Sequence, residues 1–143
     1  MKALQSIAVV FSLMIINQAA GQEIANKQRA FAGHWALKMS NGAAGWMALE
    51  LNEGEWNGQL WTVGEPKAIK DLRYADGKLT FKRALRIGPP EYPGGPYTGE
   101  REMLDLEASL KGDDIRVVMK IPDGKPFVHN GKRLPPLPPR PDL

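Results

Sequence analysis

The sequence predicts an all-β domain, an antiparallel meander of about seven or eight strands that closes into a small barrel. Two observations predict it. Apolar residues recur at every second position over short segments, which is the spacing of a strand with one buried face. Turn signals such as Asn41-Gly42 and Asp76-Gly77 separate these segments. Because each strand is apolar on one face only, the sheet must curl into a barrel or, alternatively, pair with a second sheet as a β-sandwich.

The strands can be followed in order along the chain. In the first, Trp35, Leu37 and Met39 alternate with polar or small residues, and the clearest pair is 104–110 with 115–121, on either side of a Gly-Asp turn. The segments with this pattern are 35–39, 46–51, 56–63, 68–74, 78–85, 104–110 and 115–121, and 127–129 is a further candidate. Together they predict a β-barrel domain over residues 33–130.

The chain before the strands is expected to be a cleaved signal peptide over residues 1–21 and a lead-in over 22–32. Lys2 precedes an apolar run of about ten residues, and small residues follow up to Gly21, after which we expect cleavage. The run is too short for a membrane span, which needs about 20 residues, and a buried N-terminal helix is the alternative. We therefore expect a secreted or periplasmic protein without membrane attachment after cleavage, whose lead-in is a short helical turn or frayed.

The composition narrows the classes of partner and cofactor. The chain has 143 residues and no cysteine, so neither a disulfide framework nor a cysteine-based metal site is expected. The formal net charge is +3, but the 19 basic and 16 acidic residues are interspersed, which disfavours a nucleic-acid interface. The two histidines, His34 and His129, show no metal-ligand spacing and are expected at the surface or at a strand edge. No metal and no cofactor are predicted.

One segment, residues 88–99, breaks the meander with four prolines and four glycines. Proline cannot donate to a strand ladder, so the segment is not a central strand. Long loops of this kind are either functional lids or disordered.

Four aromatic residues are the candidate ligand contacts: Trp56, Trp61, Tyr92 and Tyr97. Flat aromatic faces stack on sugar rings and on apolar ligands, and tryptophan favours sites with one wet edge. Trp56 and Trp61 have opposite parity, so in a regular strand one points inward and the other outward. Packing in the core or at the rim is the alternative role for all four.

The acidic pair Asp105 and Glu107 is the candidate for catalysis. Two residues apart on a strand, these carboxylates lie about 7 Å from each other, within the separation that glycoside hydrolysis uses. They also alternate with leucines on what should be the solvent face, where carboxylates remain ionised. No nucleophile–base arrangement and no phosphate-binding loop is visible.

Two motifs carry resemblances to known proteins. Gly33 and Trp35, in Gly-x-Trp spacing at the head of the meander, resemble the start of lipocalin-like barrels, in which the tryptophan plugs one end. The Pro-rich tail over 131–143 resembles the connector of secreted bacterial proteins of the 3-keto-disaccharide hydrolase type. In those proteins a small β-domain with a Gly-x-Trp strand and a Gly-Trp strand, here Gly45-Trp46, precedes the connector.

The resemblance implies an accessory module and its linker, without the larger sandwich that carries the hydrolase assignment in that family. It implies a secreted, non-catalytic β-module that binds or positions a ligand, either a carbohydrate or a small apolar molecule, beside a glycan-processing hydrolase. One alternative is a fragment or divergent member of the hydrolase family that uses Asp105 and Glu107. Another is a structural interaction domain that docks on a partner hydrolase through the tail, since polyproline segments bind aromatic grooves.

Overall fold

The structure is a computed structural model that describes residues 18–62, 65–93 and 95–136. Most of the expected signal peptide, residues 1–17, and the end of the tail, 137–143, lie outside the described residues. The chain falls into two units, Met1–Ala30 and Phe31–Leu143.

The first unit is helical over residues 18–29. This helix is longer than the short turn expected for the lead-in. It includes Gly21, and cleavage after that residue stays a prediction. Glu23 and Lys27, one helical turn apart, form an ion pair of 2.7 Å on its surface. No helix among the described residues is long and apolar enough to cross a membrane.

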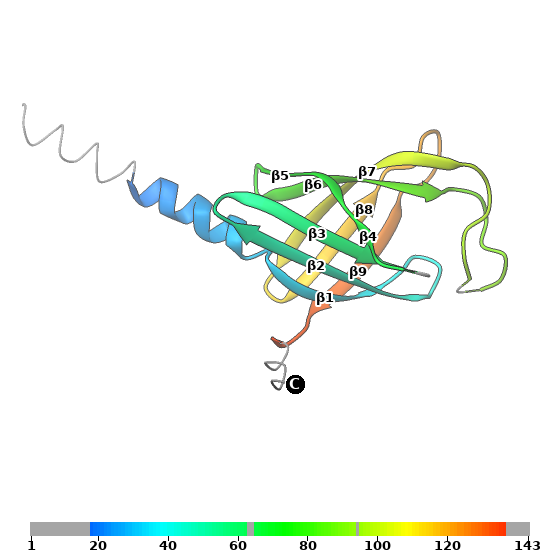
Figure 1. Ribbon diagram of the computed structural model, residues 1–143, viewed down its shortest axis with the longest axis horizontal. Coiled ribbons are helices and arrows are strands. Elements are labelled where there is room, and N and C mark those ends of the chain that lie inside the picture. The colour runs from blue at the N-terminus through cyan, green and yellow to red at the C-terminus, as the bar shows by residue number, and fades with distance from the viewer. Residues whose placement is uncertain (1–17, 63–64, 94, 137–143) are drawn as a thin grey trace, which may run out of the picture. The chain divides into compact units, whose positions relative to one another are not determined.

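The second unit is one antiparallel sheet of nine strands (Figure 1). The strands are β1 (Gly33–Lys38), β2 (Ala44–Asn52), β3 (Glu55–Trp61), β4 (Lys67–Ala68), β5 (Lys70–Ala75), β6 (Lys78–Arg86), β7 (Arg101–Lys111), β8 (Asp114–Met119) and β9 (Phe127–Arg133). Their order in the sheet is β4-β3-β2-β1-β9-β8-β7-β6-β5. Because β1 pairs with both β2 and β9, the first and last strands join two meanders into one sheet. The all-β antiparallel fold that the alternation predicts is confirmed.

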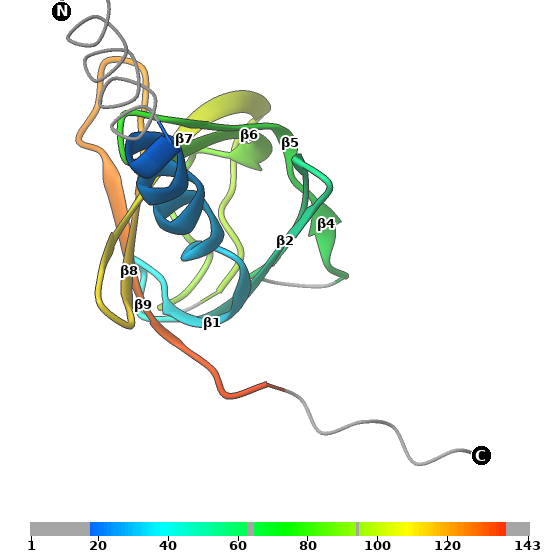
Figure 2. The same cartoon turned by 90° about the vertical axis from the view of Figure 1, so that its left-hand side faces the viewer.

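The sheet curls into a nearly closed barrel, so the strands are arranged in a ring in the view of Figure 2. Its two edge strands, β4 and β5, are consecutive in the chain and are separated by Ile69 alone. The Ile69 amide donates to the Gly58 carbonyl of β3 at 2.9 Å. A β-carbon on Gly58 would lie 3.0 Å from both Ile69 Cδ1 and Leu72 Cδ1. The missing side chain therefore lets the two edges approach, and the barrel, rather than the two-sheet sandwich, is observed.

Apart from shifts at the ends of strands, two predictions differ from the structure. The segment expected as one strand over 68–74 is two strands, because the chain changes its pairing partner at Ile69: β4 pairs with β3, and β5 pairs with β6. Within β5 the register also shifts between Lys70 and Arg73. Asp71 lies inside that shift with a φ of 54°, a left-handed conformation that aspartate tolerates better than most residues.

The second correction is the start of the tail. The prediction that the linker begins at residue 131 is wrong, because residues 131–133 belong to β9 and pair with β1. Even the Leu134 amide donates to the His34 carbonyl at 2.8 Å. The physical reason is that the first proline of the tail is Pro135, so every residue before it keeps its N–H donor.

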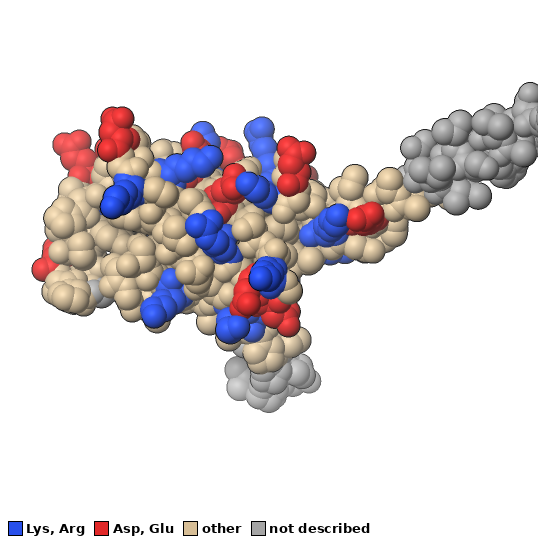
Figure 3. All heavy atoms as spheres, turned by 180° about the vertical axis from the view of Figure 1, so that it is seen from behind, with Lys and Arg blue, Asp and Glu red and all other residues tan. Residues whose placement is uncertain are grey.

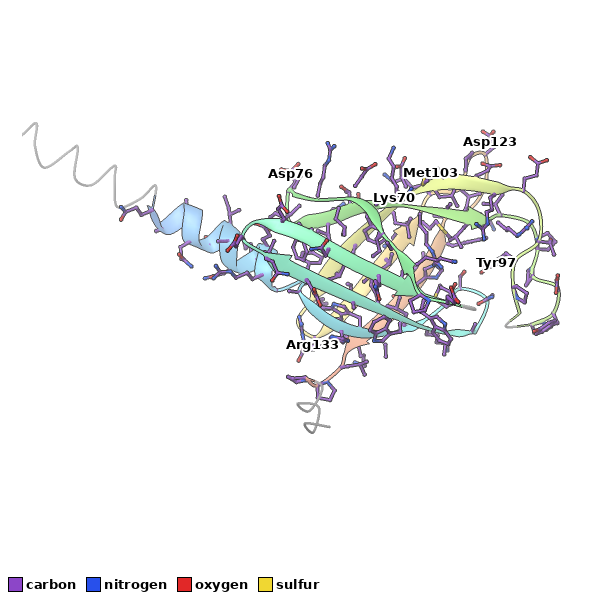
Figure 4. All side chains as sticks on the ribbon, viewed as in Figure 1. Lys70, Asp76, Tyr97, Met103, Asp123 and Arg133 are labelled. Carbon is purple, nitrogen blue, oxygen red and sulfur yellow. The ribbon has the colours of Figure 1, made fainter. Side chains whose placement is uncertain are left out.

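The core fills the barrel with the inward-facing residues of the alternating strands. Trp35 of the Gly-x-Trp motif is completely buried, and its Nε1 donates to the Phe31 carbonyl at 3.0 Å. The Arg133 guanidinium lies over the Trp35 ring at 4.2 Å from its centre, a cation–π contact. Tyr97 and Arg133 lie toward opposite ends of the barrel (Figure 4). Trp35 and Arg133 thus close the barrel at the end opposite to Tyr97.

Candidate functional site

The four aromatic candidates do not converge on one site. Trp56 faces inward and packs against the core, whereas Trp61 lies on the outer face of β3 opposite Trp46, so the predicted opposite orientation is confirmed. Tyr92 is 61% exposed on the Gly/Pro segment. Of the four, Tyr97 alone lines the cavity at one end of the barrel. Of the four predicted ligand-contact residues, Tyr97 is therefore the one placed to contact a molecule in that cavity.

The acidic candidates lie together on the outer face of β7, as the alternation predicts. Glu107 is 2.6 Å from Lys78, and Asp105 is 3.8 Å from Lys82, in ion pairs across to β6. The hydrogen bond and the charge of Lys78 lower the pKa of Glu107, against a smaller opposing effect of burial. A glycosidase acid needs a raised pKa. This geometry gives no support to catalysis by the pair.

A cavity of about 480 Å³ opens at the end of the barrel that carries Tyr97. The antiparallel meander brings several strand ends together here, so residues distant in sequence share its walls. Sites for small organic molecules are commonly about 300 to 1,000 Å³ in volume. Its apolar walls include Met39, Leu85, Tyr97, Met103 and Met119.

All charged residues that line this cavity, among those the structure describes, are cations. They are Lys67, Lys70, Lys82, Arg83, Arg86 and Arg101. The outer face of the barrel is different, because acidic and basic side chains are interspersed on the face drawn in Figure 3. Lys82 pairs with Asp105, whereas none of the other five cations takes part in an ion pair among the described residues, so the cavity has a more positive potential than the mixed outer surface.

Arg83 is the buried member of these cations. It faces inward from β6, on the same face of the strand as Phe81 and Leu85, and only 6% of the residue is exposed. Its Nη2 donates to Thr62 Oγ1 at 3.1 Å, but within the described part of the chain Nε and Nη1 have no hydrogen-bond partner. None of the ion pairs among the described residues includes it. Burial lowers the pKa of Arg83 to about 10, so at neutral pH it is a charged and uncompensated group.

His129 lines the same cavity from β9 and is 1% exposed. The expectation of a surface or edge histidine is wrong, because its parity in β9 directs it inward. Its Nδ1 accepts a hydrogen bond of 3.1 Å from the Ser40 amide, which assigns the ring proton to Nε2. Burial, with a smaller contribution from the charge of Arg83, lowers the pKa of His129 to about 4. The ring is therefore neutral at physiological pH, and Nε2–H is its one donor.

The Gly/Pro segment forms one wall of the cavity as a short hairpin. The Gly88 amide donates a 2.7 Å hydrogen bond to the Thr98 carbonyl, and Pro90 forms an antiparallel β-bridge with Tyr97. The Tyr97 hydroxyl is 3.1 Å from Ser40 Oγ, and its ring stacks on Phe127 with 5.3 Å between centres. Of the lid and disordered alternatives, the described residues of this segment favour a lid that is held to the rim.

Family, sequence and structure comparisons bear on none of these residues. No family model, curated protein or solved structure matches the chain. The relation to proteins of the 3-keto-disaccharide hydrolase type therefore stays a prediction. Among the described residues no group of three or more His, Asp or Glu side chains is placed to hold a metal ion.

The residues that matter most here, Arg83 and His129, were not among the sequence candidates. A signal for Arg83 was present, since it has the same parity as Leu79, Phe81 and Leu85 in a strand that alternates cleanly. A charged residue at an inward position is a departure from the pattern, and such departures indicate functional sites.

Proposed function

We propose that this protein is a non-catalytic binding protein that holds a small organic molecule in the mouth of its barrel. The observation that supports this most is the cavity itself: an apolar-walled space of about 480 Å³ with a few polar groups from different strands. Concave apolar sites with few, well-placed polar groups are typical of small-molecule binding.

The chemistry of the walls favours an apolar or amphipathic molecule over a neutral carbohydrate. Sugar binding would use exposed aromatic faces, but of the aromatic candidates only Tyr97 lines the cavity, and one of its faces stacks on Phe127. Met39, Leu85 and Met119 instead offer flexible apolar contacts. Export and an accessory role beside a glycan-processing hydrolase remain part of the proposal, on the sequence resemblance alone.

A cavity-filling variant tests this function. Ala43 lines the cavity, whereas Ala75 is exposed at the end of β5 and lines no part of it. Calorimetric titration of the purified protein with octan-1-ol, octanoate and cellobiose should detect one-to-one binding of at least one alkyl probe. Ala43→Phe should abolish this binding, and Ala75→Phe should leave it unchanged. Absence of binding to all three probes, or binding that survives Ala43→Phe, would contradict the proposal.

A further inference from the structure

We propose that the cavity selects a monocarboxylate whose remaining part is apolar, and that Arg83 binds the carboxylate. This inference rests on the proposed binding function and adds the chemical class of the ligand. Its starting point is the buried guanidinium of Arg83, which has two nitrogens without partners among the described residues. An unpaired buried charge is costly, so a buried guanidinium that lacks partners calls for an explanation, and a bound anion would supply one.

The chemistry of arginine favours a carboxylate as that ligand group. The planar guanidinium presents a fixed set of N–H donors that matches two oxygen acceptors, and charge-assisted bonds of this kind are stronger than neutral ones. Thr62 occupies only Nη2, at 3.1 Å, so Nε–H and Nη1–H remain to be satisfied. A neutral alcohol or sugar would leave the charge uncompensated, and an ammonium group would repel it.

The surroundings of Arg83 support a negative partner in a second way. The five other charged residues that line the described part of the cavity are also cations, so no wall residue neutralises Arg83. His129 lines the same space and is neutral, with Nδ1 already bonded to the Ser40 amide. It can donate through Nε2–H to an anion, and it cannot supply the missing negative charge.

The apolar part of the ligand follows from the other walls. Met39, Leu85 and Met119 line the cavity with Arg83, and Met103 and Tyr97 extend this apolar surface. A ligand with one acidic end and an alkyl or aromatic body satisfies both parts of the site. A fully polar anion such as inorganic phosphate would pair with Arg83 but leave the methionine walls without contacts.

Three matched probes separate this inference from the proposed function. Octanoate, octan-1-ol and octylamine have the same chain and differ in the charge of the head group. Hydrogen bonds to charged groups contribute about 1.5 to 3 kcal/mol, so octanoate should bind about 10- to 100-fold more tightly than octan-1-ol, and octylamine more weakly than both. Equal affinity for octanoate and octan-1-ol would overturn the carboxylate assignment and leave the binding function standing. Absence of binding to all three would overturn both.

Variants of Arg83 complete the test. Arg83→Gln should reduce octanoate affinity to about that of octan-1-ol, and Arg83→Lys should give an intermediate loss. Arg73→Gln is the matched control, because Arg73 is an exposed residue of β5 outside the cavity. Circular dichroism checks that each variant is folded. Unchanged octanoate affinity in Arg83→Gln, or tighter binding of sodium phosphate than of octanoate, would overturn the proposal.

Discussion

Arg83→Met should make the ligand-free barrel more stable, although it removes the anchor of the proposed site. Burial lowers the pKa of Arg83 by between two and three units from its ordinary value, to about 10. Each unit corresponds to about 1.4 kcal/mol, so burying the charged form costs about 3 kcal/mol relative to the unfolded chain. Because the folded-state pKa is the lower one and the group is charged in both states at neutral pH, this cost is present at every pH well below about 10.

Two further effects contribute to the change in the free energy of unfolding of Arg83→Met. Methionine loses the hydrogen bond to Thr62 Oγ1, which contributes about 1 kcal/mol. Its unbranched apolar side chain fits a position beside Phe81 and Leu85, with Met39 and Met119 on the cavity wall. The net expectation is a gain of about 2 kcal/mol in the free energy of unfolding, the direction seen when buried charges are replaced by apolar residues of similar size.

The assay is urea unfolding without ligand, followed by tryptophan fluorescence, on wild type, Arg83→Met and Arg73→Met. The midpoint should rise in Arg83→Met with an unchanged slope, which shows a change in stability rather than in the unfolded state. The exposed Arg73 should change stability by less than about 0.5 kcal/mol. A loss of stability in Arg83→Met of about 1 kcal/mol or more would contradict this expectation, because it would mean that the Arg83 guanidinium already has its partners in the ligand-free protein.

Three further predictions concern the rest of the barrel. Burial lowers the pKa of His129 from 6.5 to about 4, so between these values the unfolded chain binds a proton that the folded protein does not. Stability should therefore decline as pH falls through this window, by as much as about 3 kcal/mol, and urea titrations at several pH values should show a smaller decline in His129→Gln. Gly131→Ala should destabilise the barrel by at least about 2 kcal/mol, because its β-carbon would lie 2.7 Å from the Ala36 carbonyl oxygen; thermal unfolding with wild-type stability would contradict this. Glu107→Gln, which breaks an exposed ion pair with Lys78, should cost less than about 1 kcal/mol and leave octanoate affinity unchanged, whereas lost binding would assign Glu107 a role in the site.

The fold was predictable because its signal is local. Alternation over 104–110 and 115–121 predicts two strands with one buried face each, and the structure pairs them as β7 and β8. Two boundaries were not predictable in the same way. The break at Ile69 depends on the residues on its two sides pairing with different strands, β3 and β6, and residues 131–133 form a strand because β1 lies beside them.

The candidate site was much harder to predict, because it depends on which strand ends meet. Tyr97, Arg83 and His129 come from distant parts of the chain, and the barrel brings them to one cavity. Arginine is exposed in most proteins, so the residue type alone gives no reason to place Arg83 in a site. Its parity in β6, which it shares with Phe81 and Leu85, is the signal that places it inside the barrel.

Octanoate affinity in wild type and Arg83→Met, measured by titration calorimetry at neutral pH, decides whether Arg83 binds the carboxylate. We expect the affinity to be about 10- to 100-fold lower in Arg83→Met, which is at the same time more stable than wild type. Octanoate affinity that is equal in the two proteins would contradict it.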